Sequence, residues 1–142
     1  MNTYSWYSQL MKPSWAPPSF LFGPVWTFLY VLIAVSFGKV FWLAWKKEIA
    51  LIVVLPFLLN IIFNLLFTPI QFGLKNNLLA SVDILLVLIT LIWAMIAIYG
   101  ASTKLLSAGG SDIRWIAYIQ IPYFLWVSFA TVLQLIITYL NR

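Results

Sequence analysis

Four long apolar stretches alternate with short polar segments along this chain of 142 residues. Each stretch is long enough to cross a hydrocarbon core of about 30 Å, which takes about 20 apolar residues in an α-helix. The stretches are Ser19 to Trp45, Ile49 to Phe72, Asn76 to Thr103 and Arg114 to Tyr139. The pattern predicts an all-α, multi-pass integral membrane protein. Residues 1–142 would form a single membrane domain, with four transmembrane helices in a bundle and residues 1–18 as an N-terminal loop on the outer side.

Polar side chains in the second stretch fall on one face of the predicted helix. They recur at intervals of four, four and three, as Asn60, Asn64, Thr68 and Gln71. Inside a bilayer such side chains turn towards protein or a wet cavity. Pro56 and Pro69 lie in the same stretch. We expect them to bend the helix or loosen its hydrogen bonds, which opens space for a pocket between helices.

The eight tryptophans separate into interfacial and interior candidates. Tryptophan is expected at the membrane interface, so those near the middle of a stretch are the informative ones. Trp126 shares a helical face with Tyr123, which favours an interior position. Trp26 fits either an interior or a lipid-facing position, and Trp93 fits a lipid-facing position. We expect Trp26, Trp126 and the amide face of the second stretch to converge.

Asp83 is the acidic residue that lies well inside a stretch. An ionisable group at that depth costs about 2.5–3.5 kcal/mol on insertion scales. We expect a structural role, in which Asp83 forms an interhelical hydrogen bond to a Trp, a Tyr or a backbone group. A proton or ligand site is the alternative. Asn60 and Tyr123 are assigned structural polar roles of the same kind.

The amino-acid composition excludes several kinds of catalytic and metal-binding site. Hydrophobic residues make up 64% of the chain and charged residues 8%, and there is neither cysteine nor histidine. The chain therefore lacks the residues for disulfides, thiolate catalysis and the usual zinc and haem ligands, and we expect no metal site. The net charge of +5 suits anionic lipid headgroups or an anionic ligand, with ordinary flanking charge as the alternative, and no nucleic-acid surface is indicated.

The segment Lys12 to Pro18 precedes the first stretch and contains three prolines and Trp15. Proline fixes φ and cannot donate a backbone hydrogen bond, so this segment is expected to be a stiff, extended loop. We interpret it as a lid where the chain enters the membrane, shaped by Trp15, Pro17 and Pro18.

Five motifs in order make the chain resemble the translocator protein family, also called tryptophan-rich sensory proteins or peripheral-type benzodiazepine receptors. The motifs are WYSQLMKPSWAPP from Trp6, PVWTFLY from Pro24, NLLFTPIQFG from Asn64, ASVDILL from Ala80 and IPYFLWVSFATVL from Ile121. The resemblance covers nearly the whole chain.

The resemblance implies a function that composition does not reveal. Family members bind tetrapyrroles such as protoporphyrin, isoquinoline and benzodiazepine ligands and, in some cases, sterols, in a pocket between helices beneath the loop. By motif, the pocket here would be lined by Tyr7, Trp26, Tyr30, Asn64, Phe67, Thr68, Trp126 and Ala130. The expected role is a sensor, carrier or regulator of tetrapyrroles that needs no cofactor.

Family members have five helices, the first of which precedes the Trp-Tyr loop. In this sequence Met1 lies five residues before Trp6, so that helix is not part of it. The resemblance therefore implies either a start codon further upstream or a bundle completed by a second chain. We expect a homodimer, or weaker ligand binding than in a five-helix relative; lipid or sterol partners remain open.

Two other functional classes are open. Light-driven or oxidative breakdown of a bound porphyrin, with Trp26 and Trp126 as participants, is the alternative that the resemblance implies. No acid–base pair or nucleophile supports conventional catalysis, so we expect a binding protein and not an enzyme. A small drug exporter would need an acidic residue inside its first span, and Ser19 to Trp45 contains none.

Overall fold

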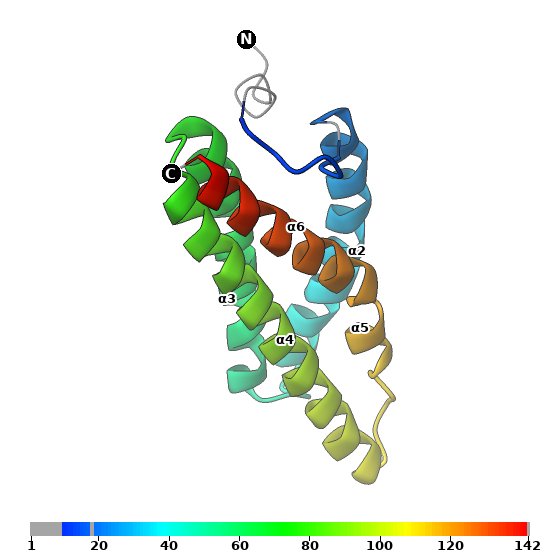
Figure 1. Cartoon of the computed structure of the whole chain (residues 1–142). Helices are drawn as coiled ribbons and strands as arrows, with labels where there is room; N and C mark the ends of the chain where they lie inside the picture. The colour runs from blue at the N-terminus through cyan, green and yellow to red at the C-terminus, as the bar shows by residue number, and fades with distance from the viewer. Residues whose placement is uncertain (1–9, 18, 142) are drawn as a thin grey trace.

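The computed structural model describes residues 10–17 and 19–141, and this part of the chain is helical apart from the N-terminal loop of residues 10–17 and short connections (Figure 1). It contains four helical units that are long and apolar enough to cross a membrane. They are α2 (Phe22–Trp45), α3 (Leu51–Thr68), α4 (Asn77–Ser107) and the unit Trp115–Leu140, formed by α5 (Trp115–Tyr118) and α6 (Ile121–Leu140). The predicted all-α fold with four membrane helices is confirmed.

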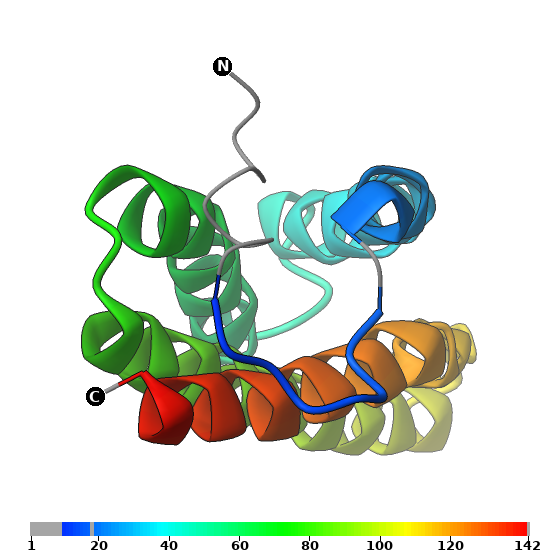
Figure 2. The same cartoon turned by 45° about the horizontal axis from the view of Figure 1, so that its top comes forward.

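The long helix α4 is the centre of the bundle. It packs against α3 on one side and against α5 and α6 on the other, while α2 packs against α3. Figure 1 shows α6 crossing the upper half of the molecule obliquely, and Figure 2 shows residues 10–17 running along α6 before the chain turns into α2. A short 3₁₀-helix, η1 (Ser19–Leu21), leads into α2.

Prolines lie at the two positions where the regular α-helical pattern of a membrane span is interrupted. After Thr68 the α-helical pattern gives way to one π-helical turn, η2 (Pro69–Gly73), in which the Leu74 amide donates to the Pro69 carbonyl at 2.9 Å. The stretch expected as one helix from Arg114 to Tyr139 is divided at Ile119–Gln120. Pro122 has no N–H for the Tyr118 carbonyl, so the helix restarts at Ile121 with proline in its first turn.

Local chemistry also fixes the ends of α4. Asn76 caps its N-terminus, because the Asn76 Oδ1 accepts a hydrogen bond from the Leu79 amide at 2.9 Å. At the other end Gly109 has a φ of 83°, a left-handed conformation that favours glycine, and the next amide, Gly110, donates to the Leu105 carbonyl. The chain can therefore reverse directly after Ser107 towards α5.

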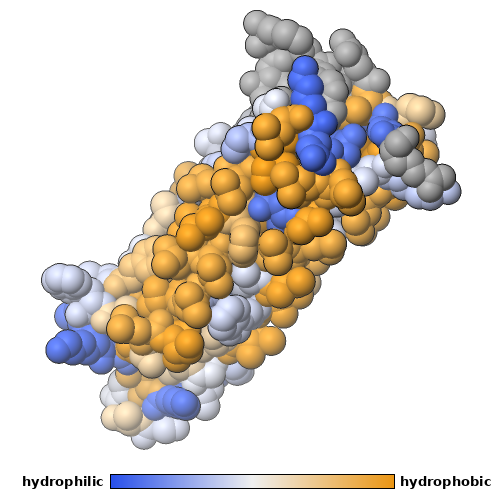
Figure 3. Space-filling view, turned by 90° about the vertical axis from the view of Figure 1, so that its left-hand side faces the viewer, coloured by the Kyte–Doolittle hydropathy of each residue, from blue (hydrophilic) through white to orange (hydrophobic). Residues whose placement is uncertain are grey.

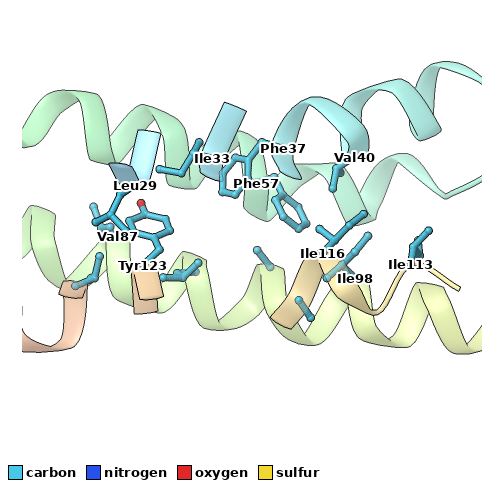
Figure 4. Close-up of a cluster of buried hydrophobic side chains, with 14 of the residues drawn as sticks. Leu29, Ile33, Phe37, Val40, Phe57, Val87, Ile98, Ile113, Ile116 and Tyr123 are labelled. Atoms are coloured by element: carbon cyan, nitrogen blue, oxygen red, sulfur yellow. The ribbon is translucent and has the colours of Figure 1, made fainter. Parts of the chain in front are cut away.

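A continuous apolar core joins all the long helices (Figure 4). Its centre is an edge-to-face pair between Phe37 of α2 and Phe57 of α3, whose ring centroids lie 4.9 Å apart. Val87 and Ile98 of α4 and Tyr123 of α6 contribute further fully buried side chains. This core fixes the separation of α2, α3 and α6 at the level of the polar and aromatic residues described below.

The outer surface is apolar where lipid would cover it. Figure 3 shows a broad hydrophobic band on the side of α3 and α4, with hydrophilic residues gathered towards the two ends of the molecule. At one end Trp42 lies between two cations, with the Nζ atoms of Lys39 and Lys46 each 4.2 Å from its ring centroid. Such Lys–Trp contacts are typical of a membrane interface.

Candidate functional site

A chain of buried and partly buried hydrogen bonds links three helices in the upper half of the bundle. The Tyr30 hydroxyl of α2 donates to the Asn64 Oδ1 of α3 at 2.9 Å. The Asn64 Nδ2 donates to the Tyr123 hydroxyl of α6 at 2.6 Å, and that hydroxyl donates in turn to the Asn60 Oδ1 at 2.8 Å. Asn60, Asn64 and Tyr123 are buried, so their polar groups find their partners within the protein.

The same network reaches the fourth helix through Asn60. Its Nδ2 donates to the Val87 carbonyl at 2.9 Å and to the Thr90 Oγ1 at 3.2 Å, both in α4. The Thr90 hydroxyl donates back to the Leu86 carbonyl of its own helix. Hydrogen bonds between membrane helices contribute on average about 0.6 kcal/mol each, so this network orients the helices more than it stabilises them.

An aromatic cluster lies directly beside this network, between α2 and α6. Trp26 is at its centre: its ring centroid is 5.6 Å from that of Tyr30, 6.4 Å from that of Trp126 and 6.5 Å from that of Tyr123. The members of this aromatic cluster are Trp15, Phe22, Trp26, Tyr30, Tyr123, Trp126 and Phe129. Most of these contacts are edge-to-face, an arrangement that places ring faces towards neighbouring space.

Trp126 contains a donor that is left unpaired. Its Nε1 atom is buried and has no hydrogen-bond partner within residues 10–17 and 19–141. An unpaired buried N–H costs about 1–3 kcal/mol, so buried indole nitrogens are usually paired. The Trp126 N–H is therefore a buried donor whose hydrogen bond the described part of the chain does not supply.

Two hollows adjoin the aromatic cluster. A groove of about 420 Å³ lies between α2 and α6, with an almost entirely apolar lining that includes Pro17, Phe28, Leu125, Trp126 and Phe129. Its size falls in the range of small-molecule sites, about 300–1,000 Å³. A smaller hollow of about 110 Å³ lies between α2 and α3, and its lining includes Tyr30, Asn60 and Asn64.

The N-terminal loop borders the larger groove and is held against α6. The Met11 amide donates to the Asn141 Oδ1 at 3.1 Å, and the Asn141 Nδ2 donates to the Met11 carbonyl at 2.9 Å. Trp15 meets Phe129 edge-to-face with ring centroids 5.5 Å apart, and Pro17 lines the groove. The described part of the loop thus covers α6 at the mouth of the groove.

The residues that the sequence predicted as pocket lining do not all lie together in the structure. Trp26, Tyr30, Asn64 and Trp126 come together in the network and the aromatic cluster. Phe67 and Ala130 are half-buried against the main apolar core, and Thr68 is exposed in the last turn of α3. Tyr7 and Pro18 lie outside the described residues.

Asp83 is buried in α4, with only 4% of its surface exposed. The sequence favoured an interhelical hydrogen bond for this carboxyl group. Its Oδ2 atom has no hydrogen-bond partner within the described ranges. Among those same residues no cluster of three or more Asp or Glu side chains could hold a metal ion.

Two members of the aromatic cluster, Phe22 and Phe129, are not among the pocket residues that the sequence predicted. Phe22 contacts Trp126 at 6.2 Å between ring centroids, and Phe129 contacts it at 5.7 Å. Phe129 lies three residues after Trp126, and Phe22 lies four residues before Trp26. Helical neighbours of the interior tryptophans, at spacings of three and four, are the signal that points to them.

At the opposite end of the molecule, charge stabilises a loop. Arg114 forms a bidentate ion pair with Asp112. The Arg114 Nη2 donates to the Asp112 Oδ2 at 2.7 Å, and the Arg114 Nε donates to the Asp112 Oδ1 at 3.0 Å. The Arg114 side chain holds the pKa of Asp112 below its usual range, and Asp112 raises the pKa of Arg114 above its own. This ion pair positions the start of α5, away from the aromatic cluster.

Comparison with known proteins places the chain in one family. The sequence profile of the TspO/MBR family matches residues 1–140. The chain is 38% identical to the tryptophan-rich protein TspO of Bacillus cereus over 96% of this chain and 81% of that protein. It is 35% identical to the TspO of Chlorobaculum tepidum, over 96% and 80% of the two chains, and 32% identical to the translocator protein of Homo sapiens, over 91% and 70%. With its four membrane-spanning helical units, the chain is a multi-pass integral membrane protein and belongs to the TspO/MBR family.

Proposed function

We propose that the chain binds planar, hydrophobic ligands of the tetrapyrrole class, such as protoporphyrin, beside the aromatic cluster between α2 and α6. It would act as a sensor, carrier or regulator of these ligands and not as an enzyme. A relative is named a tryptophan-rich sensory protein and another a translocator protein, and neither name describes catalysis.

The observation that carries this proposal is that Trp126 lines the apolar groove and also has a buried N–H without a hydrogen-bond partner among the described residues. A flat macrocycle gains most from aromatic faces at stacking distance, which Trp126 and Phe129 offer in the groove lining. Protoporphyrin also carries carboxylates, and a carboxylate is a strong acceptor for a buried N–H. The proposed site would thus combine an apolar contact surface with one polar contact, made by the Trp126 N–H.

The variant Trp126→Phe tests the polar contact, because it keeps an aromatic ring and removes the N–H. A hydrogen bond to a charged group contributes about 1.5–3 kcal/mol, which corresponds to a loss of affinity of about tenfold or more. The measurement is the dissociation constant of protoporphyrin, from quenching of tryptophan fluorescence in the dark. Trp45→Phe is the matched control, since Trp45 is 85% exposed and lies at the C-terminal end of α2.

The dimethyl ester of protoporphyrin distinguishes the two parts of the proposal. It keeps the macrocycle and removes both carboxylates, so wild type and Trp126→Phe should bind it with similar affinity. Equal protoporphyrin affinity for Trp126→Phe and Trp45→Phe would rule out the indole N–H as a ligand contact. Absence of saturable binding to the wild type would rule out the function itself.

Light-driven breakdown of the bound porphyrin is the second candidate. The contact between Trp26 and Trp126, 6.4 Å between centroids beside the groove, places two oxidisable indoles together. If this function holds, porphyrin absorbance should fall under light with the wild type, and the double variant W26F/W126F should lose this turnover while still binding. Stable absorbance of the bound pigment under light would exclude breakdown.

A further inference from the structure

A second groove, remote from the aromatic cluster, lies between the start of α3 and the second half of α4. Its volume is about 470 Å³, within the range of ligand sites of about 300–1,000 Å³. The α3 side contributes Glu48, Ile52 and Val53, and the α4 side contributes residues from Trp93 to Ala108. We call it the α3–α4 groove.

The length of the groove corresponds to one leaflet of a bilayer. Trp93 and Lys104 both line it, and they are 11 residues apart on α4, which amounts to about 16 Å at about 1.5 Å per residue. The hydrocarbon core is about 30 Å thick, so the groove reaches from the interface to about the midplane. Trp93 is 39% exposed at the inner end, at a depth where lipid headgroups do not reach.

Two opposite charges lie at the outer end. Glu48 and Lys104 both line the groove and both are exposed. Neither forms an ion pair in the part of the chain that the structure describes, where the one ion pair joins Asp112 and Arg114. The outer end therefore offers a carboxylate and an ammonium group to the same bound molecule.

Between these ends the groove is hollow because α4 carries small residues there. Ala97, Gly100 and Ala101 line it. A Cβ atom built on Gly100 meets no atom within 4 Å, so this position opens directly into free space. An unbranched hydrocarbon chain can lie along such a trough in contact with the helix backbone.

We propose that the α3–α4 groove binds one phospholipid with a phosphoethanolamine headgroup. One acyl chain lies along Gly100 towards Trp93, the phosphate contacts the Lys104 ammonium, and the primary ammonium of the lipid contacts the Glu48 carboxylate. The pairing follows from charge complementarity, because the headgroup carries one charge of each sign on neighbouring groups, as the outer end of the groove does.

Other occupants fit these charges less well. An apolar helix of a second copy would leave Glu48 and Lys104 opposite hydrocarbon, which is costly for both. A lipid with an anionic headgroup lacking an amine would place a second negative charge beside Glu48. Phosphatidylcholine has the same net charge, but its quaternary ammonium has no N–H to donate to the carboxylate.

The test measures quenching of tryptophan fluorescence by phospholipids brominated near the ends of their acyl chains. The protein is reconstituted in bilayers in which brominated phosphatidylethanolamine, phosphatidylcholine or phosphatidylglycerol replaces part of the unbrominated lipid. The Trp93 signal is the difference between wild type and Trp93→Phe. We expect this signal to be quenched at about five- to tenfold lower mole fraction of the ethanolamine lipid than of the other two.

Three variants dissect the groove. Glu48→Gln should remove most of the preference for ethanolamine over choline, and Lys104→Gln should weaken the binding of both. Gly100→Leu should fill the trough and abolish the selective quenching. Gly38→Leu is its matched control, because Gly38 is also an exposed helical glycine with free space at its Cβ position, on α2, and it should behave as wild type.

Equal quenching of Trp93 by all three lipids, or a preference for the ethanolamine lipid that survives Glu48→Gln, would overturn the proposal in favour of ordinary lipid contact. A dimer in bilayers, detected by crosslinking, that Gly100→Leu disrupts and Gly38→Leu preserves would also overturn it, because a second copy would then occupy the groove. Glu48→Gln alters no packed side chain, so it decides the question even if Gly100→Leu reduces the yield of folded protein.

Discussion

Replacement of Tyr123 by phenylalanine tests the polar network that joins the helices at the candidate site. The Tyr123 hydroxyl accepts a hydrogen bond from Asn64 at 2.6 Å and donates one to Asn60 at 2.8 Å, and the residue is fully buried. The substitution removes both bonds, keeps the ring in the core and leaves one buried group on each asparagine unpaired. Hydrogen bonds between membrane helices contribute about 0.6 kcal/mol on average and up to about 1.7, so the expected loss is about 1–3 kcal/mol.

The free energy of unfolding can be measured by titration with SDS in mixed micelles, with helix content followed by circular dichroism. Tyr30→Phe is the graded control, because Tyr30 is 41% exposed and donates a single bond in the network, to Asn64. It should lose less than about 1 kcal/mol. Tyr118→Phe, at a position 56% exposed, should change little. Equal stability of Tyr123→Phe and Tyr118→Phe would show that the Tyr123 hydroxyl contributes nothing to the stability of the bundle.

Two further predictions concern the end of the molecule near α5. Gly109→Ala should lower the free energy of unfolding by about 1 kcal/mol, because the φ of 83° at Gly109 is left-handed and alanine disfavours it. Gly38→Ala, inside α2, should instead raise the free energy of unfolding by up to about 1 kcal/mol. The same SDS titration measures both variants, and equal effects would contradict a special backbone conformation at Gly109. Because Arg114 holds the pKa of Asp112 below its usual range, the ion pair contributes fully above a pH of about 4 and its contribution is lost as the pH falls further. Between about pH 5 and pH 2 the wild type should therefore lose more thermal stability than Asp112→Asn, and parallel pH profiles of the two melting temperatures would count against the ion pair.

The sequence predicted the helices and the burial of some residues of the candidate site, because a bilayer restricts where polar groups can lie. The spacing of Asn60 and Asn64 placed them on one face of a helix, and in the structure both are buried in the network. The face that Trp126 shares with Tyr123 likewise turns towards α2 and Trp26. Polar residues within an apolar stretch are informative because lipid cannot form hydrogen bonds with them, so they must turn towards other parts of the protein.

The sequence could not supply what depends on how the helices are rotated and tilted against one another. Asn64 is hydrogen-bonded to residues 34 and 59 positions away, and no local pattern specifies such partners. The apolar pattern does not reveal the break before Ile121, because Pro122 lies within one continuous apolar run. The α3–α4 groove arises from free space beside Gly100, which becomes visible only when neighbouring side chains are in place.

The proposed ligand of the groove beside Trp126 is a planar, carboxylate-bearing macrocycle. The decisive experiment is a titration of the purified wild-type protein with protoporphyrin in the dark, with tryptophan emission and porphyrin absorbance followed together. We expect saturable quenching with a spectral shift of the bound pigment, and a dissociation constant about tenfold higher for Trp126→Phe. Linear, non-saturating quenching that is the same for wild type, Trp126→Phe and Trp45→Phe would contradict it.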